Sequence, residues 1–240
     1  MIEIDKIYNE DCLIGMQRIP DGSVNCIITD PPYVISRTKG GGSVNNIKKF
    51  NVSLQQLDDA NLRDGYDMVS FAREVKRLQG DRINAYIWCN KAQIADYFKI
   101  YVGEMGCKFE ILCWHKDNAL PTYSNKYLTD TEYCLYFHNG GFTHPKDYDD
   151  AKTYYVGLIN HKDKKLWHHP SIKPQGLIQR FIRNSTNEGD IILDPFIGSG
   201  TTAAAAICEK RRFIGFEIHE EYYKMACRRI REEQAQLKLF

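Results

Sequence analysis

The sequence of 240 residues lacks the features that mark several classes of protein. No apolar run approaches the ~18 residues that a membrane-spanning helix needs. The first residues do not show the basic-then-apolar order of a signal peptide. We therefore expect a cytoplasmic protein with no membrane association. Internal repeats are also absent, and the contents of 43% hydrophobic and 26% charged residues are typical of a folded globular chain.

Cysteine spacing excludes the common zinc and redox motifs. The sequence has eight cysteines, but no two of them have C-x-x-C spacing. Most lie in apolar runs, which is typical of small buried side chains in a reducing compartment. His168 and His169 are adjacent, which is poor spacing for two ligands of one metal, so no metal site is predicted.

An excess of one charge is missing as well. The 32 basic and 31 acidic residues give a net charge of +1, which gives no support for a nucleic-acid binder. Phosphates respond to local charge, however, and residues 33–57 carry four cations and no acid. A second basic group lies in residues 162–165. On charge alone, solvated loops are the preferred interpretation. The four cations of the first group are Arg37, Lys39, Lys48 and Lys49.

Short apolar runs alternate with stretches of helical periodicity, which predicts a doubly wound α/β sheet in one domain over residues 1–240. Two polar segments, 34–65 and 139–168, interrupt the alternation, and long irregular segments are usually functional or mobile. Strands are predicted at 24–29, 82–89, 109–115, 132–138, 190–193 and 212–218, and helices at 66–79, 92–105, 177–184, 201–209 and 220–236.

A glycine turn follows one of these strands, in residues 191–203 (IILDPFIGSGTTA). Glycines there let the backbone approach a bound nucleotide. Glu217, at the end of the next strand, could accept hydrogen bonds from both ribose hydroxyls. The G-x-G-x-x-A pattern that starts at Gly198 also fits an NAD enzyme. Asp194 disfavours that alternative, because a carboxylate repels a pyrophosphate but tolerates a sulfonium or an ammonium. An ordinary turn without a ligand is the third interpretation.

The predicted strand at 24–29 runs directly into Asp30-Pro31-Pro32-Tyr33. The two prolines fix the backbone and remove two N–H donors, so this is a rigid strand exit. A carboxylate and a backbone carbonyl facing one point are suited to an amino group, which has two protons to donate. The tyrosine ring offers a face on which a planar base can stack. The competing interpretation is a Pro-Pro turn with a capping aspartate and a core tyrosine.

Taken together, these motifs resemble the amino-directed DNA methyltransferases, which act on adenine N6 or cytosine N4. The Asp-Pro-Pro-Tyr tetrad is similar to their catalytic motif, and residues 194–202 are similar to their S-adenosylmethionine loop. Residues 169–174 (HPSIKP) resemble the family's HPTQKP segment, and residues 114–118 (WHKDN) resemble its Trp-x-Lys-x-Asn stretch. The opening segment around Asp11 is similar too. The catalytic motif precedes the cofactor loop, which is typical of the β subclass.

The resemblance implies a Rossmann-like, seven-stranded, circularly permuted methyltransferase sheet with a small inserted recognition region. It implies that Asp30, Pro31, Pro32 and Tyr33 form the catalytic site. Asp30 and the Pro31 carbonyl would accept hydrogen bonds from the target amino group, and Tyr33 would stack on the flipped base. For S-adenosylmethionine it implies that Asp11 approaches the adenine, Lys173 the carboxylate and Glu217 the ribose. Phe196, Gly198 and Gly200 are implied to shape the methionine-side pocket and Asp194 to lie beside it, and Thr201 is a further implied cofactor-binding residue.

The predicted reaction is adenine-N6 methylation of DNA by direct attack of the amino nitrogen on the methyl group, with no covalent intermediate. The base must leave the duplex to reach the site. We expect residues 34–65 to form a mobile loop over the DNA, with Arg37, Lys39, Lys48 and Lys49 on phosphates, and residues 139–168 to read the groove. The departures from the family pattern are Ile172 in place of glutamine, Ser171 in place of threonine and Glu10 in place of glycine.

Several alternatives share this fold. Cytosine-N4 methyltransferases more often have serine at position 30, and protein-glutamine methylation would favour asparagine there. An RNA target and a non-catalytic DNA-binding partner subunit are further alternatives. Cytosine-C5 methylation is disfavoured because its Pro-Cys motif is absent. Homodimers are common in the subclass, so a homodimer is carried as an expectation.

Overall fold

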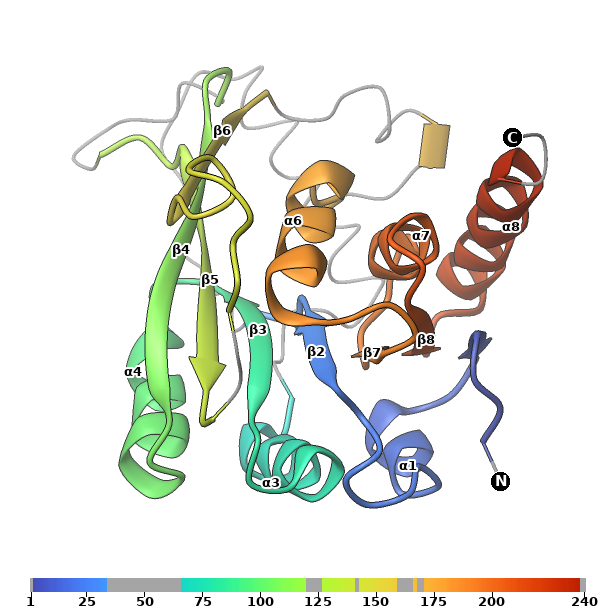
Figure 1. The fold of residues 1–240 in the computed structure, drawn as a ribbon, viewed down its shortest axis with the longest axis horizontal. Coiled ribbons are helices and arrows are strands. Elements are labelled where there is room, and N and C mark those ends of the chain that lie inside the picture. The colour runs from blue at the N-terminus through green and yellow to red at the C-terminus, as the bar shows by residue number, and fades with distance from the viewer. Residues whose placement is uncertain are drawn as a thin grey trace, which may run out of the picture.

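The computed structural model describes residues 2–33, 66–119, 127–140, 143–158, 166–167 and 171–237. In this part of the chain, eight strands form one sheet in the order β1-β8-β7-β2-β3-β5-β4-β6 (Figure 1). All neighbours are parallel except the two pairs that involve β5. The strands are β1 (Lys6–Tyr8), β2 (Cys26–Thr29), β3 (Asn84–Cys89), β4 (Lys108–Lys116), β5 (Thr131–His138), β6 (Tyr154–Gly157), β7 (Ile191–Asp194) and β8 (Arg212–Phe216).

Helices cover both faces of the sheet. Figure 1 shows two helix groups, with α1, α3 and α4 along the lower side of the view and α6, α7 and α8 above them. None of the described helices is long and apolar enough to cross a membrane. The helices are α1 (Cys12–Met16), α3 (Met68–Gln79), α4 (Ile94–Tyr97), which continues into the π-helical segment η1 (Phe98–Glu104), α6 (Gln175–Ser185), α7 (Thr201–Cys208) and α8 (Glu220–Leu237).

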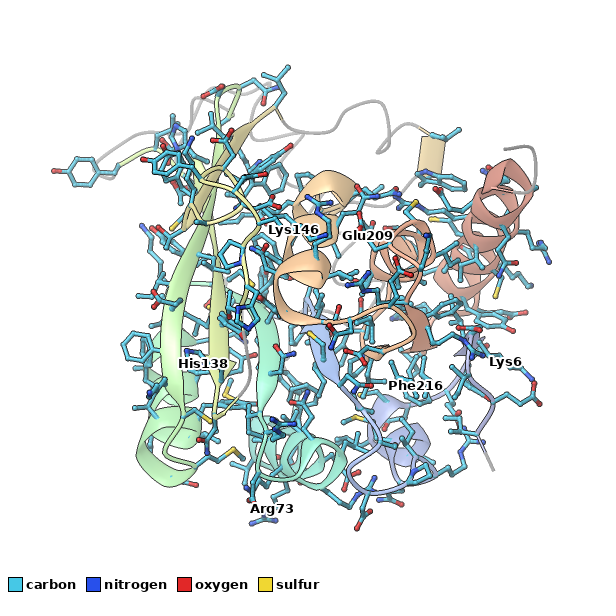
Figure 2. The ribbon with its side chains drawn as sticks, in the orientation of Figure 1. Lys6, Arg73, His138, Lys146, Glu209 and Phe216 are labelled. Carbon is cyan, nitrogen blue, oxygen red and sulfur yellow. The ribbon has the colours of Figure 1, made fainter. Side chains whose placement is uncertain are left out.

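Alternation along the central strands creates two separate cores. Ile27 of β2 packs with the α1 and α3 side, whereas its neighbours Cys26 and Ile28 pack with α6 and α7. This is the two-residue period of a strand that is buried on both faces. Side chains fill both layers, and Phe216 is labelled at the end of β8 (Figure 2). This residue is fully buried, and its ring packs against that of Tyr8.

The topology brings the two sequence motifs to one edge of the sheet. Strands β2 and β7 are parallel neighbours, with Ile27 paired to Leu193. The tetrad follows β2 and the glycine turn follows β7, so both leave the sheet at its carboxyl edge. In open α/β sheets, ligands bind in the crevice outside this edge.

The predicted fold class is confirmed, but the described sheet has eight strands instead of seven. One strand, β6, comes from the 139–168 segment that was predicted to be an irregular insertion. Its four residues, YYVG, show no alternation of polar and apolar residue types, so their sequence did not predict a strand, although in the structure Tyr154 and Val156 are half exposed and their neighbours less so. Helix α6 holds the same segment, because Arg180 donates to the Asp149 and Tyr154 carbonyls.

Candidate active site

Asp194 lies at the end of β7, where it links the two motifs. Its Oδ1 accepts hydrogen bonds from Thr29 Oγ1 of β2 at 2.8 Å and from the Phe196 N–H at 3.1 Å. Burial raises the pKa of Asp194 to about 7. A carboxyl group whose pKa is raised by desolvation is ionised more readily when a cation binds beside it. The site therefore fits a positively charged ligand group.

Glu217 follows β8 and closes the glycine turn from the other side. Its Oε2 accepts from the Gly198 N–H at 3.0 Å and its Oε1 from the His219 N–H at 2.9 Å. Burial raises the pKa of Glu217. A carboxylate oxygen has two lone pairs, so each oxygen retains capacity for a further donor such as a ribose hydroxyl.

The glycine turn depends on two left-handed residues. Gly198 has φ of 49° and Gly200 has φ of 78°. A Cβ atom on Gly200 would lie 3.1 Å from both Cα and Cβ of Ala226 in α8. Glycine is thus required at position 200 both by the backbone conformation and by the close approach of a helix backbone.

Replacing Gly200 by alanine is expected to lower the free energy of unfolding by about 1–3 kcal/mol, because strain in this backbone region adds to the contact with α8. Urea denaturation followed by circular dichroism measures it. Gly176, where a Cβ would meet no atom within 4 Å, provides the matched glycine-to-alanine control. An unchanged midpoint for Gly200→Ala would contradict the role assigned to this turn.

Three other predicted cofactor residues have partners within the protein. Phe196 packs edge-on to Tyr66, with ring centroids 5.2 Å apart. Thr201 Oγ1 accepts from the buried Arg229 guanidinium at 2.8 Å, which ties the turn to α8. Asp11 caps α1 by accepting from the Leu13 and Ile14 N–H groups. Contacts of these residues with a cofactor stay predictions.

The tetrad presents Asp30 with its two oxygens in different surroundings. Oδ1 accepts a hydrogen bond from the Tyr33 hydroxyl. Oδ2 accepts from Lys173 Nζ at 2.5 Å, and Ser171 Oγ lies 3.4 Å from it. The segment between β3 and α4 supports the turn, because Gln93 Nε2 donates a hydrogen bond to the Pro32 carbonyl at 3.3 Å.

Lys173 has a second acidic partner, which the sequence did not reveal. Its Nζ lies 2.9 Å from Glu132 Oε2 at the start of β5, and Lys116 at the end of β4 contacts Glu132 Oε1. Burial opposes the charge on Glu132, but Lys173 and Lys116 outweigh it and lower its pKa to about 2. The predicted contact of Lys173 with the cofactor carboxylate is untested; in the described structure its ammonium faces Asp30 and Glu132.

The structure thus brings Asp30, Tyr33, Lys173 and Asp194 to one edge of the sheet, and their roles in binding and catalysis stay predictions. The predicted DNA-binding residues Arg37, Lys39, Lys48 and Lys49 lie outside the described residues, as do most of residues 159–170. The sequence pointed to Lys116 only as part of a matching stretch, and it gave no indication of Glu132.

The ionisation of Asp194 gives a pH-dependent expectation. Below about pH 7 the buried carboxyl is protonated, and a bound sulfonium favours its ionised form. Binding of S-adenosylmethionine should then release a proton, so affinity should rise with pH up to about 7, by at most about tenfold per pH unit. Isothermal titration calorimetry between pH 5.5 and 8.5 measures this. Asp194→Asn should flatten the profile relative to the native chain, and equal profiles would contradict the assignment.

The sequence model of a DNA methylase family, the N6/N4 methyltransferases, matches residues 24–228. The match covers most of the chain, including both motifs at the sheet edge, and the chain therefore belongs to this family of DNA methylases.

Individual relatives agree with this assignment. The chain is 56% identical to the DNA adenine methyltransferase YhdJ of Escherichia coli, over 95% of this chain and 83% of that protein. It is 30% identical to the type II methyltransferase M2.DpnII of Streptococcus pneumoniae, over 95% of this chain and 90% of that protein.

Solved structures have the same fold. The crystal structure of the M1.HpyAVI–SAM complex superposes with a TM-score of 0.66 at 25% identity, covering 93% of this chain and 98% of that one. The cytosine-N4-specific PvuII DNA methyltransferase superposes with a TM-score of 0.70 at 19% identity, covering 95% and 87%. At that identity the second likeness concerns the fold alone.

Proposed function

We propose that this protein is an S-adenosylmethionine-dependent DNA methyltransferase that modifies adenine at N6. One observation carries the proposal: Thr29 of β2 donates to Asp194 of β7 at 2.8 Å, so the strand exits that bear the tetrad and the glycine turn adjoin. An amine-accepting group and a cation-tolerant pocket therefore lie next to each other. The 56% identity to a DNA adenine methyltransferase supports adenine as the base.

The residues present fit S-adenosylmethionine, which supplies an electrophilic methyl group when bound. Two buried carboxyl groups flank the glycine turn, and burial raises the pKa of both. Asp194 would lie by the positive methionine end, and Glu217 would hold the ribose hydroxyls. The left-handed Gly198 and Gly200 let the turn approach the ligand closely.

The tetrad would prepare the adenine amino group for attack. Its nitrogen is a poor nucleophile because the lone pair is delocalised into the ring. Hydrogen bonds from both amino protons, to Asp30 and to the Pro31 carbonyl, favour a pyramidal nitrogen with the lone pair released. Positioning and fixed electrostatics then supply most of the catalysis. The Tyr33 ring would stack on the base once its hydroxyl leaves Asp30.

The first experiment is incubation with tritiated-methyl S-adenosylmethionine and unmethylated genomic DNA, followed by digestion and nucleoside separation. Label in N6-methyladenine is the expected result. Label in N4-methylcytosine would support methyl transfer to an amino group but would contradict adenine as the target base. No label in DNA, with cofactor binding intact, would overturn the proposal in favour of an RNA target or a non-catalytic subunit.

We also propose that the segment 34–65 contacts DNA through its four cations. Replacing Arg37, Lys39, Lys48 and Lys49 by alanine is expected to weaken DNA binding and to reduce the slope of log affinity against log salt by up to about 3–4, since each phosphate contact contributes ~0.9 on duplex DNA. Fluorescence anisotropy at several salt concentrations measures this. An unchanged slope would place the contacts elsewhere.

A further inference from the structure

Behind the tetrad, four charged side chains form a row of alternating sign. Asp30 contacts Lys173, Lys173 contacts Glu132, and Glu132 contacts Lys116. They come from the exit of β2, the segment before α6, the start of β5 and the end of β4. These positions meet because β5 is antiparallel to both β3 and β4, so its first residues lie at the carboxyl edge.

Both ammonium groups also rest on buried indole rings. Lys173 Nζ is 4.9 Å from the ring centroid of Trp88, and Lys116 Nζ is 5.0 Å from that of Trp114. Both rings are almost fully buried. A cation over an aromatic face is attracted by the negative face of the ring, and this attraction grows when the cation is desolvated. The rings and Glu132 together confine each ammonium to one position.

A contribution to the stability of the fold is a weak explanation for the presence of these four charged side chains. Only 6% of the Lys173 side chain is exposed, so burying its charge has a large desolvation cost. Apolar residues of similar size commonly do as well or better in such places. A fixed charge is useful, however, where it orients a group that takes part in a reaction. Asp30, at the end of this row, is the residue proposed to accept a hydrogen bond from the target amino group.

We propose that Glu132 and Lys116 are positioning residues for methyl transfer, which act on Asp30 through Lys173. The inference rests on the proposed function of the tetrad. Glu132 is the second carboxylate on the Lys173 ammonium, at 2.9 Å, and Lys116 in turn contacts Glu132. Lys173 occupies Oδ2 of Asp30, which leaves Oδ1, the oxygen that now contacts Tyr33, to receive the amino group.

The expected effect is on the orientation of the Asp30 carboxylate more than on cofactor binding. Neither Glu132 nor Lys116 belongs to the glycine turn, so their loss should leave that turn and its two flanking carboxyl groups intact. Loosening Lys173 would let the Asp30 carboxylate rotate or shift. A displacement of about 1 Å at a reacting group can lower a rate by ~10²-fold.

The test is Glu132→Gln, which keeps the shape and removes the charge. Single-turnover methylation of unmethylated genomic DNA is expected to slow by about 10–100-fold. The dissociation constant for S-adenosylmethionine, from calorimetry, should stay within about threefold. Tryptophan fluorescence should also change, because the ammonium groups over Trp88 and Trp114 both lose a carboxylate neighbour. Glu110→Gln on the exposed part of β4 is the matched control and should change none of these.

A double variant separates positioning from folding. Glu132→Gln alone leaves two neighbouring cations with one acid, whereas Glu132→Gln with Lys116→Met restores the charge balance. The double variant is expected to recover the melting temperature but not the single-turnover rate. Recovery of both would show that Glu132 serves only stability and would overturn the inference. A native rate in a folded Glu132→Gln chain would do so too, while an inactive native chain would instead refute the proposed function.

Discussion

Replacing Asp30 by asparagine is expected to lower the rate of methyl transfer by about 10²–10³-fold, the usual effect of removing one fixed transition-state hydrogen bond. Lys173 Nζ lies 2.5 Å from Oδ2 and cannot accept a hydrogen bond, so it selects the amide oxygen for that position. The amide nitrogen then occupies the position of Oδ1. There it presents a donor to the amino group, which also donates, and the interaction turns from attractive to repulsive.

Single-turnover kinetics with unmethylated DNA measures this effect. S-adenosylmethionine affinity should stay within about threefold, because Asp30 belongs to the segment that follows β2, whereas the glycine turn follows β7. Asp96→Asn, at an exposed position of α4, is the matched control and should keep the native rate. An Asp30→Asn enzyme with native rate would remove the tetrad from the mechanism.

Replacing Lys173 by methionine is expected to lower the free energy of unfolding by about 3–5 kcal/mol at pH 7, the usual effect of removing one partner from a buried ion pair. Asp30 and Glu132 both contact this ammonium, so its removal leaves two neighbouring carboxylates without the cation that they share. Urea denaturation of the cofactor-free protein measures the change. Lys99→Met, at an exposed position of η1, is the control and should have almost no effect.

The pH dependence of that loss distinguishes charge from packing. In the native chain the pKa of Glu132 is lowered from 4.5 to about 2, so its ion pairs contribute stability above pH 4.5. This contribution is lost as the pH falls through about 2. The stability gap between the native chain and Lys173→Met should therefore narrow between pH 4.5 and 2. A gap that stays constant over this range would indicate lost packing of the lysine stem instead.

Much of the fold could be predicted from local patterns. Strands β2 and β3 are continuous apolar runs, and α3 carries apolar residues at helical spacing. The local sequence of each segment therefore predicts its secondary structure. The tetrad and the glycine turn are contiguous in sequence, and their position after strands predicted their place at the sheet edge. Strand β1 was missed because three residues are too few to show a period.

The partners of Asp30 could not be predicted in the same way. Lys173 and Asp30 are 143 residues apart, and their contact depends on how the segment before α6 crosses the sheet edge. Glu132 stands at the start of an apolar strand, where a solvent-exposed acid is the ordinary expectation. Its burial follows from β5 being antiparallel to its neighbours, which brings its first residues among the carboxyl ends of the others. Strand direction is set by the whole sheet and has no local signal.

The parallel pairing of β1 with β8 and of β2 with β7 has a consequence for the order of folding. Asn9 donates to the Glu217 carbonyl across 208 residues, and Thr29 reaches Asp194 across 165. On the ribosome, β1 stays unpaired until β8 is synthesised, and β2 lacks its neighbour β7 until most of the chain has been made. Contacts of such long range slow folding and leave strand edges open to wrong pairing in the meantime. The tetrad is synthesised early, but Asp194 and Glu217 are synthesised near the end of the chain, so a chain truncated before β7 is expected to have no methylation activity.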